Sequence, residues 1–241
     1  MQKLDLLKKA LKTGLLAIVL VGSMLEMPYA HRKYIRSIAE ESAVQIFGQE
    51  GSGSGSHVKL EDGRVVILTN KHVCKMSGQL MVKDYSNSLP VARKIIAIDE
   101  AHDLCVIESL PNHKGINIGS NIEIGDELYT LGHPRGEALN VSKGEYFDDK
   151  LIEIGDNVNK EGICDEGRLT TVENIFGIVS YCVIERNTNE LSTPTYPGNS
   201  GSPVVNKYGN LVGVIFAGND QIENMGFMVP LNYVKEFLAS I

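Results

Sequence analysis

A serine between two glycines, with a histidine and an aspartate upstream, is the set of side chains in this sequence best suited to chemistry. Ser200 lies in the segment Tyr196-Pro-Gly-Asn-Ser-Gly-Ser-Pro203, and His72 and Asp103 precede it in that order. A serine hydroxyl is a weak nucleophile at neutral pH and needs an adjacent base, which an imidazole provides. An aspartate would hold that imidazole in the productive tautomer, and His, Asp, Ser is a known chain order for such a triad. These residues predict cleavage of acyl bonds, peptide bonds first among them.

The turn around Ser200 predicts an oxyanion hole as well. A glycine two residues before the nucleophile, Gly198, permits a backbone conformation closed to other residues. The turn Gly198, Asn199, Ser200 could then aim the N–H groups of Gly198 and Ser200 at one developing negative charge. Each motif alone has an ordinary explanation, such as a surface turn, so the prediction depends on their order and flanks. The alternative bases are His57, His102, His113 and His133.

Several ordered segments surround these positions. They are Gly51–Ser56 with Arg64–Val73, Ile96–Ile107, Ile124–Gly136, Gly198–Val204, Gly209–Val214 and Met225–Pro230. Together they resemble the trypsin-like, chymotrypsin-fold serine proteases, and in motif style the bacterial HtrA/Deg-type branch. The resemblance covers the chain from about residue 43 to the C-terminus, and no PDZ-like segment is expected after it. It implies His72, Asp103 and Ser200 as the catalytic triad, with the oxyanion hole at Gly198 to Ser200.

The expected fold is all-β, with two six-stranded antiparallel β-barrels and a C-terminal helix. Residues 31–241 would form the protease domain, with a first barrel at about 43–115, a second at about 116–230 and a helix at 231–240. Short apolar runs broken by Gly, Asn, Asp and Pro predict the strands. Residues 31–42 suggest a short polar helix, and Gly51–Ser56 suggests a tight strand or turn rather than a flexible linker. The predicted strands are 43–47, 64–68, 79–82, 92–98, 104–108, 126–131, 176–185, 203–206, 211–217 and 226–229.

Two departures from the family pattern carry expectations of their own. Val73 follows the histidine where digestive members carry a cystine partner. Asn199 replaces the aspartate that pairs with a newly cut N-terminus in members activated from zymogens, so no activation by such cleavage is expected. By the resemblance, the substrate pocket would be lined by Thr195, Phe216, Ala217, Gly218 and Gly226. Residues 192–196 contain no acidic group, so we expect cleavage after small or aliphatic residues.

The four cysteines are Cys74, Cys105, Cys164 and Cys182. Cys74 and Cys105 each follow a predicted triad residue on an apolar strand, which favours buried free thiols. A disulfide between Cys164 and Cys182 is a further possibility. No cysteine pair has zinc-ligand spacing, and neither a metal nor a cofactor is expected.

Charge excludes one class of partner. The net charge of −7 argues against nucleic acid, because phosphate binding requires a basic face. Residues 143–175 hold nine Asp or Glu against four Lys or Arg and predict a solvated acidic loop, with a calcium site as the alternative. The expected partner is a protein or peptide substrate. The resemblance leaves a trimer open.

Residues 1–30 predict export. Four lysines in residues 1–13 precede an uncharged, mainly apolar run at 14–25, which is short for a membrane span. A signal peptide ending near Ala30 is the first interpretation, although Pro28 makes a poor cleavage site. An uncleaved anchor, associating with the membrane through residues 14–25, and a folded helix are the alternatives. The predicted location is exported or cell-envelope. Besides a serine endopeptidase, a catalytically silent binding module and an esterase remain open.

Overall fold

The structure is a computed structural model that describes residues 29–241, apart from positions 50, 77, 87–88, 160, 165, 175–176, 219–221 and 223. The predicted signal peptide or anchor therefore lies almost wholly outside the described residues. Residues 29–42 are helical, as expected for 31–42. No helix within the described ranges has both the length and the apolar content needed to cross a membrane.

The first sheet carries the segments around His72 and Asp103. Its seven strands are antiparallel and run in the order β5-β4-β1-β2-β3-β7-β6. The Gly-Ser segment forms β2, which confirms a strand over a flexible linker. Small side chains there allow close approach, since a Cβ at Gly53 would lie 2.7 Å from Val73 and 3.2 Å from the Ser200 carbonyl oxygen. The strands are β1 (Ala43–Phe47), β2 (Ser52–Lys59), β3 (Val65–Thr69), β4 (Met81–Asp84), β5 (Val91–Ala92), β6 (Ile95–Asp99) and β7 (Leu104–Glu108).

The second sheet closes on itself. Its order is β10-β11-β14-β13-β12-β8-β9, and β9 also pairs with β11. Six strands therefore form a ring, as predicted, and β10 is added outside it. The strands are β8 (Glu127–Gly132), β9 (Asn140–Asn157), β10 (Arg168–Asn174), β11 (Gly177–Leu191), β12 (Pro203–Asn206), β13 (Leu211–Gly218) and β14 (Gly226–Pro230).

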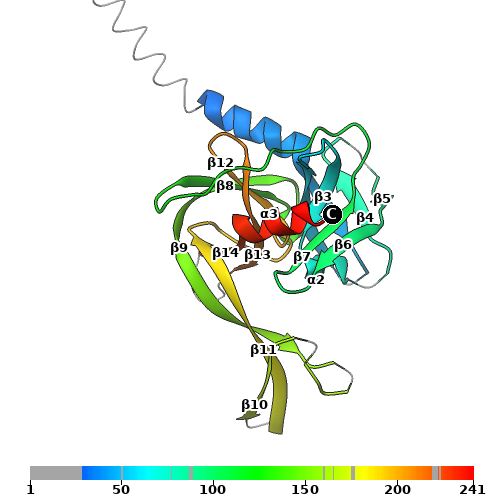
Figure 1. The fold of residues 1–241 in the computed structure, drawn as a ribbon, viewed down its shortest axis with the longest axis vertical. Helices are drawn as coiled ribbons and strands as arrows, with labels where there is room; N and C mark the ends of the chain where they lie inside the picture. Colours follow the sequence, from blue (N-terminus) through cyan, green and yellow to red (C-terminus); the bar gives the residue numbers. More distant parts are fainter. Residues whose placement is uncertain are drawn as a thin grey trace, which may run out of the picture.

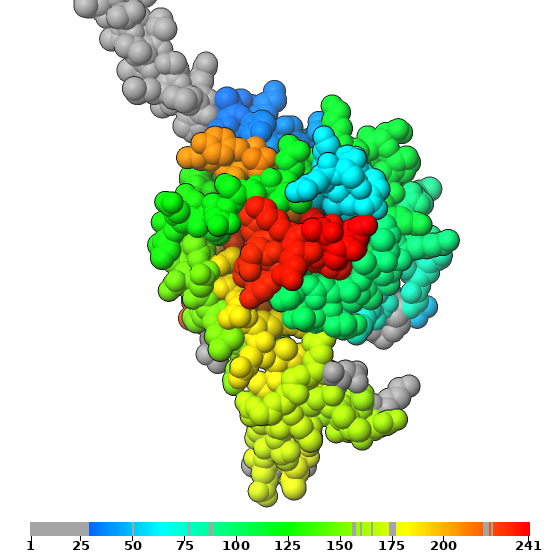
Figure 2. All heavy atoms as spheres, viewed as in Figure 1, coloured from blue at the N-terminus to red at the C-terminus, as the bar shows by residue number. Residues whose placement is uncertain are grey.

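The core joins the two sheets. One buried cluster includes Val58 and Leu68 from the first sheet and Leu131 and Val214 from the second, so the sheets share apolar contacts. Each sheet also encloses a smaller cluster of its own. The helix α3 (Leu231–Ala239) packs across β13 and β14, and it is the red element at the centre of Figure 2. Its buried residues are Leu231, Val234, Phe237 and Leu238.

The acidic segment 143–175 is mostly strand, so the prediction of a loop was wrong. Strands β9, β10 and β11 run well beyond the ring and project from the body as a ribbon, here called the arm (Figure 1). β9 and β11 stay in antiparallel register from Tyr181–Asn157 to Glu190–Asp148. Alternating side chains such as Ile152, Ile154 and Ile184 favour this extended form, and charge patterning alone did not reveal it. Among the described residues no cluster of His, Cys, Asp and Glu could hold a metal, so the calcium alternative gains no support.

Candidate active site

His72 lies on a very short helix that follows β3. This helix, α2 (Lys71–Cys74), begins after Asn70, whose backbone is extended. Asn70 does not cap the helix with its side chain. Instead its Nδ2 donates to the carbonyl oxygen of Asp103 at 3.0 Å, and the backbone N–H of Lys71 donates to the same oxygen at 3.1 Å. The start of the helix is thus tied to the aspartate.

Asp103 is held by its carboxylate as well. Its Oδ2 lies 2.8 Å from His72 Nδ1, and its Oδ1 accepts the backbone N–H of His72 at 3.0 Å. Both oxygens therefore face His72, and the carboxylate fixes the ring tautomer with a proton on Nδ1. Asp103 adopts a left-handed conformation with φ of 57°, which Asp tolerates better than most residues. The Asp103 side chain is buried, whereas 46% of the His72 side chain is exposed, so Nε2 can meet a substrate.

A disulfide joins the two segments that carry His72 and Asp103. Cys74 at the end of α2 is bonded to Cys105 on β7, 31 residues later. The expectation of free thiols at these positions was wrong. Burial and the apolar surroundings did suggest thiols that pack like hydrophobes, but α2 and β7 meet only in the folded chain, and that meeting brings the sulfurs into range. The second disulfide, Cys164–Cys182, is present as the sequence allowed.

The turn with Ser200 rests on the first sheet. The backbone N–H of Ser54 on β2 donates to the Ser200 carbonyl oxygen at 2.8 Å, and Ser54 Oγ donates to the Gly198 carbonyl oxygen at 2.7 Å. A Cβ at Gly201 would lie 2.0 Å from the Ser54 carbonyl oxygen, so only glycine permits this approach. The second-barrel turn therefore sits against β2, and the contacts at Gly53 place it beside α2.

The geometry around Gly198 suits an anion. Gly198 has φ of 93°, and a Cβ there would lie 2.6 Å from the carbonyl oxygen of His133. The neighbouring 3-10 helix η1 (Pro134–Gly136) causes this crowding. In the described part of the chain, the N–H groups of Gly198 and Ser200 donate to no internal acceptor, whereas that of Asn199 donates to Tyr196 at 2.9 Å. Two N–H groups are thus left for a ligand.

The predicted pocket residues fall into two groups. Gly218 on β13 pairs with Gly226 on β14, and Thr195 lies against both. A Cβ at Gly226 would lie 2.4 Å from Thr195 Oγ1, and one at Gly218 would lie 3.1 Å from Thr195 Cβ. Ala217 is next to Gly218 and partly buried. Phe216 is a bulge residue whose side chain lies in the core, where it borders a small cavity with His102 and Tyr233.

The other histidines have partners of their own. The ring of His113, in the segment after β7, stacks on that of His57 on β2 with the ring centroids 3.8 Å apart. His102 binds Asp99 and stacks on Tyr233. His133 is buried, which lowers its pKa, and its Nδ1 lies 3.1 Å from the Glu137 carbonyl oxygen. None of these interactions involves Asp103, so His72 is the histidine that the aspartate orients.

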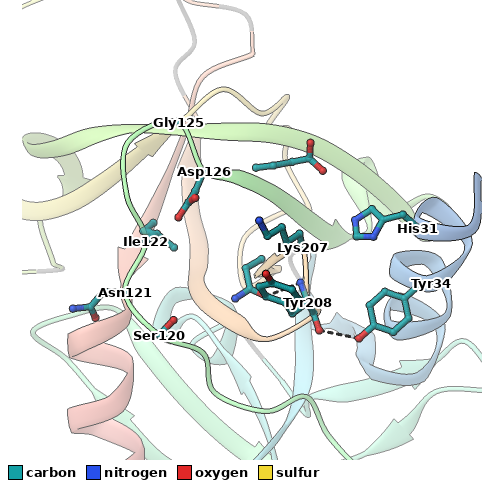
Figure 3. Close-up of a pocket in the computed structure, with 11 residues that line it drawn as sticks. His31, Tyr34, Ser120, Asn121, Ile122, Gly125, Asp126, Lys207 and Tyr208 are labelled. Atoms are coloured by element: carbon teal, nitrogen blue, oxygen red, sulfur yellow. Dashed lines mark hydrogen bonds between the residues drawn. The ribbon is translucent and has the colours of Figure 1, made fainter. Parts of the chain in front are cut away.

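The large cleft drawn in Figure 3 lies elsewhere. It occupies about 890 Å³ between the N-terminal helix and the second sheet. In Figure 3 the hydroxyl of Tyr34 points to the Tyr208 backbone, to which it donates at 2.8 Å. None of the residues predicted for the site lines this cleft. Volume alone would have misplaced the site.

Sequence comparison assigns the chain to a family. The profile described as the trypsin-like peptidase domain matches residues 53–214, which is more than half of the chain. The chain belongs to this family. The matched residues of this trypsin-like peptidase domain run from β2 into β13, and they include His72, Asp103 and Ser200.

Relatives of this trypsin-like peptidase domain include HtrA proteins. The serine protease Do-like HtrA of Bacillus subtilis (strain 168) is 29% identical over 193 residues, which cover 78% of this chain and 38% of that protein. The serine protease HtrA-like of Staphylococcus aureus (strain USA300) is 26% identical over 200 residues, covering 80% of this chain and 24% of that protein. The chain thus spans less than half the length of these relatives.

Solved structures confirm the fold. The Rv3671c protease of M. tuberculosis in its active form superposes with a TM-score of 0.64 at 18% identity, covering 86% of this chain and 83% of that one. The serine endoprotease from Yersinia pestis gives 0.63 at 20% identity, covering 87% and 65%. At such identity the likeness shows the fold alone.

Two features of the site escaped the sequence prediction. Ser54 was assigned to a Gly-Ser strand without a role, although a serine between glycines in a buried strand is a signal that a backbone approaches closely. The ion pairs of Lys71, Glu166 and Arg186 beside the site gave no sequence signal, because these residues lie far apart in the chain.

Proposed function

We propose that this chain is a serine endopeptidase of the HtrA type, with Ser200 as nucleophile, His72 as general base and Asp103 as its orienting carboxylate. The observation that carries the proposal is the His72–Asp103 pair, made by two hydrogen bonds and placed beside the Ser200 turn. Family membership supports the same assignment.

The reaction would proceed in two halves. His72 Nε2 takes the Ser200 hydroxyl proton as Oγ attacks the carbonyl carbon, and the imidazolium is stabilised by Asp103. The tetrahedral oxyanion is bound by the free N–H groups of Gly198 and Ser200. The imidazolium then gives its proton to the leaving amine, and an ester between Ser200 and the acyl group forms. His72 then takes a proton from water as that water attacks the ester carbonyl carbon, and it gives the proton to Ser200 Oγ as the bond to the acyl group breaks and the acid is released.

Cleavage after small or aliphatic residues is part of the proposal. Thr195 lies close to both Gly218 and Gly226, which narrows the proposed pocket beside these three residues. A short substrate side chain suits such a pocket. The segments 193–197, 216–218 and 226–228 carry no acidic side chain that would favour Arg or Lys. A peptide library that gave preferred cleavage after Arg or Lys would refute this part. The substrate would bind as an added strand, with main-chain hydrogen bonds setting its register.

The proposal also includes the substrate class, the location and the oligomeric state. We propose a protein substrate and an exported or cell-envelope location, as the HtrA relatives suggest. Membrane association through residues 14–25 and a trimeric state belong to the same proposal. Fractionation of expressing cells and light scattering of the purified chain would test them.

The test of the chemistry is covalent labelling. The purified full chain is treated with a fluorophosphonate probe, and mass spectrometry locates the adduct. We expect labelling at Ser200 that is lost in Ser200→Ala and His72→Ala but retained in Ser120→Ala, since Ser120 is an exposed serine of the same chain. Folded protein that stays unlabelled, or that is labelled equally without His72, would refute the proposal and favour a silent binding module.

A further inference from the structure

The base of the arm touches the segments that carry His72 and Asp103. Two side chains of the arm region make the contact, namely Glu166 in the connection between β9 and β10 and Arg186 on β11. The arm therefore does more than project into solvent. It spans from the second sheet to the side of the first sheet where the segments with His72 and Asp103 lie.

Arg186 supports the aspartate segment. Its guanidinium Nη1 donates to the carbonyl oxygen of Ala101, two residues before Asp103. Its Nη2 donates to Glu166 Oε2 at 3.1 Å. The side chain is only 9% exposed, so this positive charge depends on these partners. A planar guanidinium can serve both acceptors at once, which a lysine ammonium on a flexible stem does poorly.

Glu166 links Arg186 to the histidine helix. Its other oxygen, Oε1, accepts a hydrogen bond from Lys71 Nζ, and Lys71 directly precedes His72. The Lys71 side chain is 12% exposed and also binds Glu100 Oε2 at 2.9 Å. Burial lowers the pKa of Lys71, but the hydrogen bonds to Glu166 and Glu100 outweigh it and raise that pKa above its ordinary value. The chain of contacts runs from Ala101 through Arg186 and Glu166 to Lys71.

The second disulfide, Cys164–Cys182, anchors this series of contacts. Cys164 lies two residues before Glu166 and is bonded to Cys182 on β11. Cys182 and Arg186 are four residues apart on one strand, so their side chains leave the same face. The disulfide thereby keeps the segment with Glu166 on the face of the arm from which Arg186 extends.

We propose that Arg186 and Glu166 are positioning residues for the His72–Asp103 pair. They fix the backbone at Ala101 and the side chain of Lys71, and so hold the two triad segments at the spacing that their hydrogen bonds require. The proposal rests on the proposed function for its kinetic consequence. Its structural consequence, the hydrogen bond of His72 Nδ1, does not.

The experiment compares two arginines of the arm in the full chain. Arg186→Met removes the contact with the triad segments, and Arg168→Met is the matched control. Arg168 is 63% exposed and pairs only with side chains of the arm, Glu153 and Thr170, among the residues that the structure describes. We measure the maximal rate of fluorophosphonate labelling, the probe concentration that gives half that rate, and the far-downfield proton resonance of His72 Nδ1–H. Urea unfolding checks that each variant is folded.

We expect Arg186→Met to lower the maximal labelling rate by about tenfold to a hundredfold, as small misplacements of reacting groups do, and to leave the half-saturating concentration within about threefold. The resonance should broaden or vanish. Arg186→Lys should recover part of the rate, and Arg168→Met should match the original chain. If Arg186→Met does not fold, Glu166→Gln replaces it, because the amide is nearly isosteric, removes the negative charge from both ion pairs and leaves only one oxygen to accept a hydrogen bond.

Wild-type rate and resonance in folded Arg186→Met would overturn the proposal, as would equal losses in Arg168→Met. If the original chain does not label at all, the proposed function fails, and the His72 Nδ1–H resonance alone tests the positioning role. Its loss in Arg186→Met but not in Arg168→Met then supports positioning, and its persistence in both refutes it.

Discussion

Two serines on β2 provide the sharpest test of how the nucleophile turn is held. Ser54 and Ser56 are both buried and lie two residues apart, on the same face of the strand. Ser54 Oγ donates to the Gly198 carbonyl oxygen at 2.7 Å and accepts the backbone N–H of His133 at 2.9 Å. Ser56 Oγ has no hydrogen-bond partner among the described residues. The same substitution at the two positions should therefore have opposite consequences.

Ser54→Ala leaves two groups without a partner. The N–H of His133 is buried, and an unsatisfied buried donor costs about 1–3 kcal/mol. The Gly198 carbonyl is partly exposed and can recover water, so its lost bond costs about 1 kcal/mol. The free energy of unfolding should fall by about 2–4 kcal/mol. Ser56→Ala removes an unpaired hydroxyl and should change that free energy by about 1 kcal/mol or less, with a gain in stability as the expected direction.

Urea unfolding followed by circular dichroism measures both variants at one pH. Fluorophosphonate labelling adds a second readout, because Ser54 orients the peptide next to the proposed oxyanion donor. Labelling of Ser54→Ala should slow by about tenfold or more, whereas Ser56→Ala should label at the original rate. Equal losses of stability in the two variants would refute the reasoning, since both remove a buried hydroxyl and only the hydrogen bonds differ.

Two further predictions concern stability. Burial, with the charge of His113 next, lowers the pKa of His57 to about 4, so the unfolded state binds a proton between pH 6.5 and 4 that the folded state rejects. The free energy of unfolding should thus fall by about 3 kcal/mol across that window as the pH drops; His57→Asn should lack this part of the slope in urea titrations. The pair Cys74→Ser and Cys105→Ser opens a loop of 31 residues and should cost about 3–4 kcal/mol of unfolding free energy at neutral pH. A loss below about 1 kcal/mol in urea would contradict that role for the disulfide.

Much of the fold was predictable because its strands are short and locally marked. Alternating or continuous apolar runs bounded by turn residues gave β1, β7 and β12 their correct limits. The spacing of Leu231, Val234 and Leu238 places them on one helical face, and α3 buries all three. The full extent of the arm was not predicted, because it depends on pairing between β9 and β11, which joins residues 24 or more positions apart.

The proposed triad was assigned from the types of its residues and from their order in the chain, and both can be read directly from a sequence. A nucleophile needs a base, the base needs an orienting group, and the glycines at 198 and 201 mark a turn that no other residue could form so closely. The flanking motifs indicated the protein family. The sequence therefore supplied the proposed chemistry, the three residues proposed to perform it, and the class of fold that holds them.

Only the tertiary structure decided how those residues are held. The Cys74–Cys105 bond, the two hydrogen bonds of Ser54 and the series of contacts from Arg186 to Lys71 join segments that are separated by 31 to 144 positions. Such contacts depend on the distance between atoms after folding, and no local pattern encodes that distance. The local sequence states which groups are available, and the packing of one sheet against the other selects which of them meet.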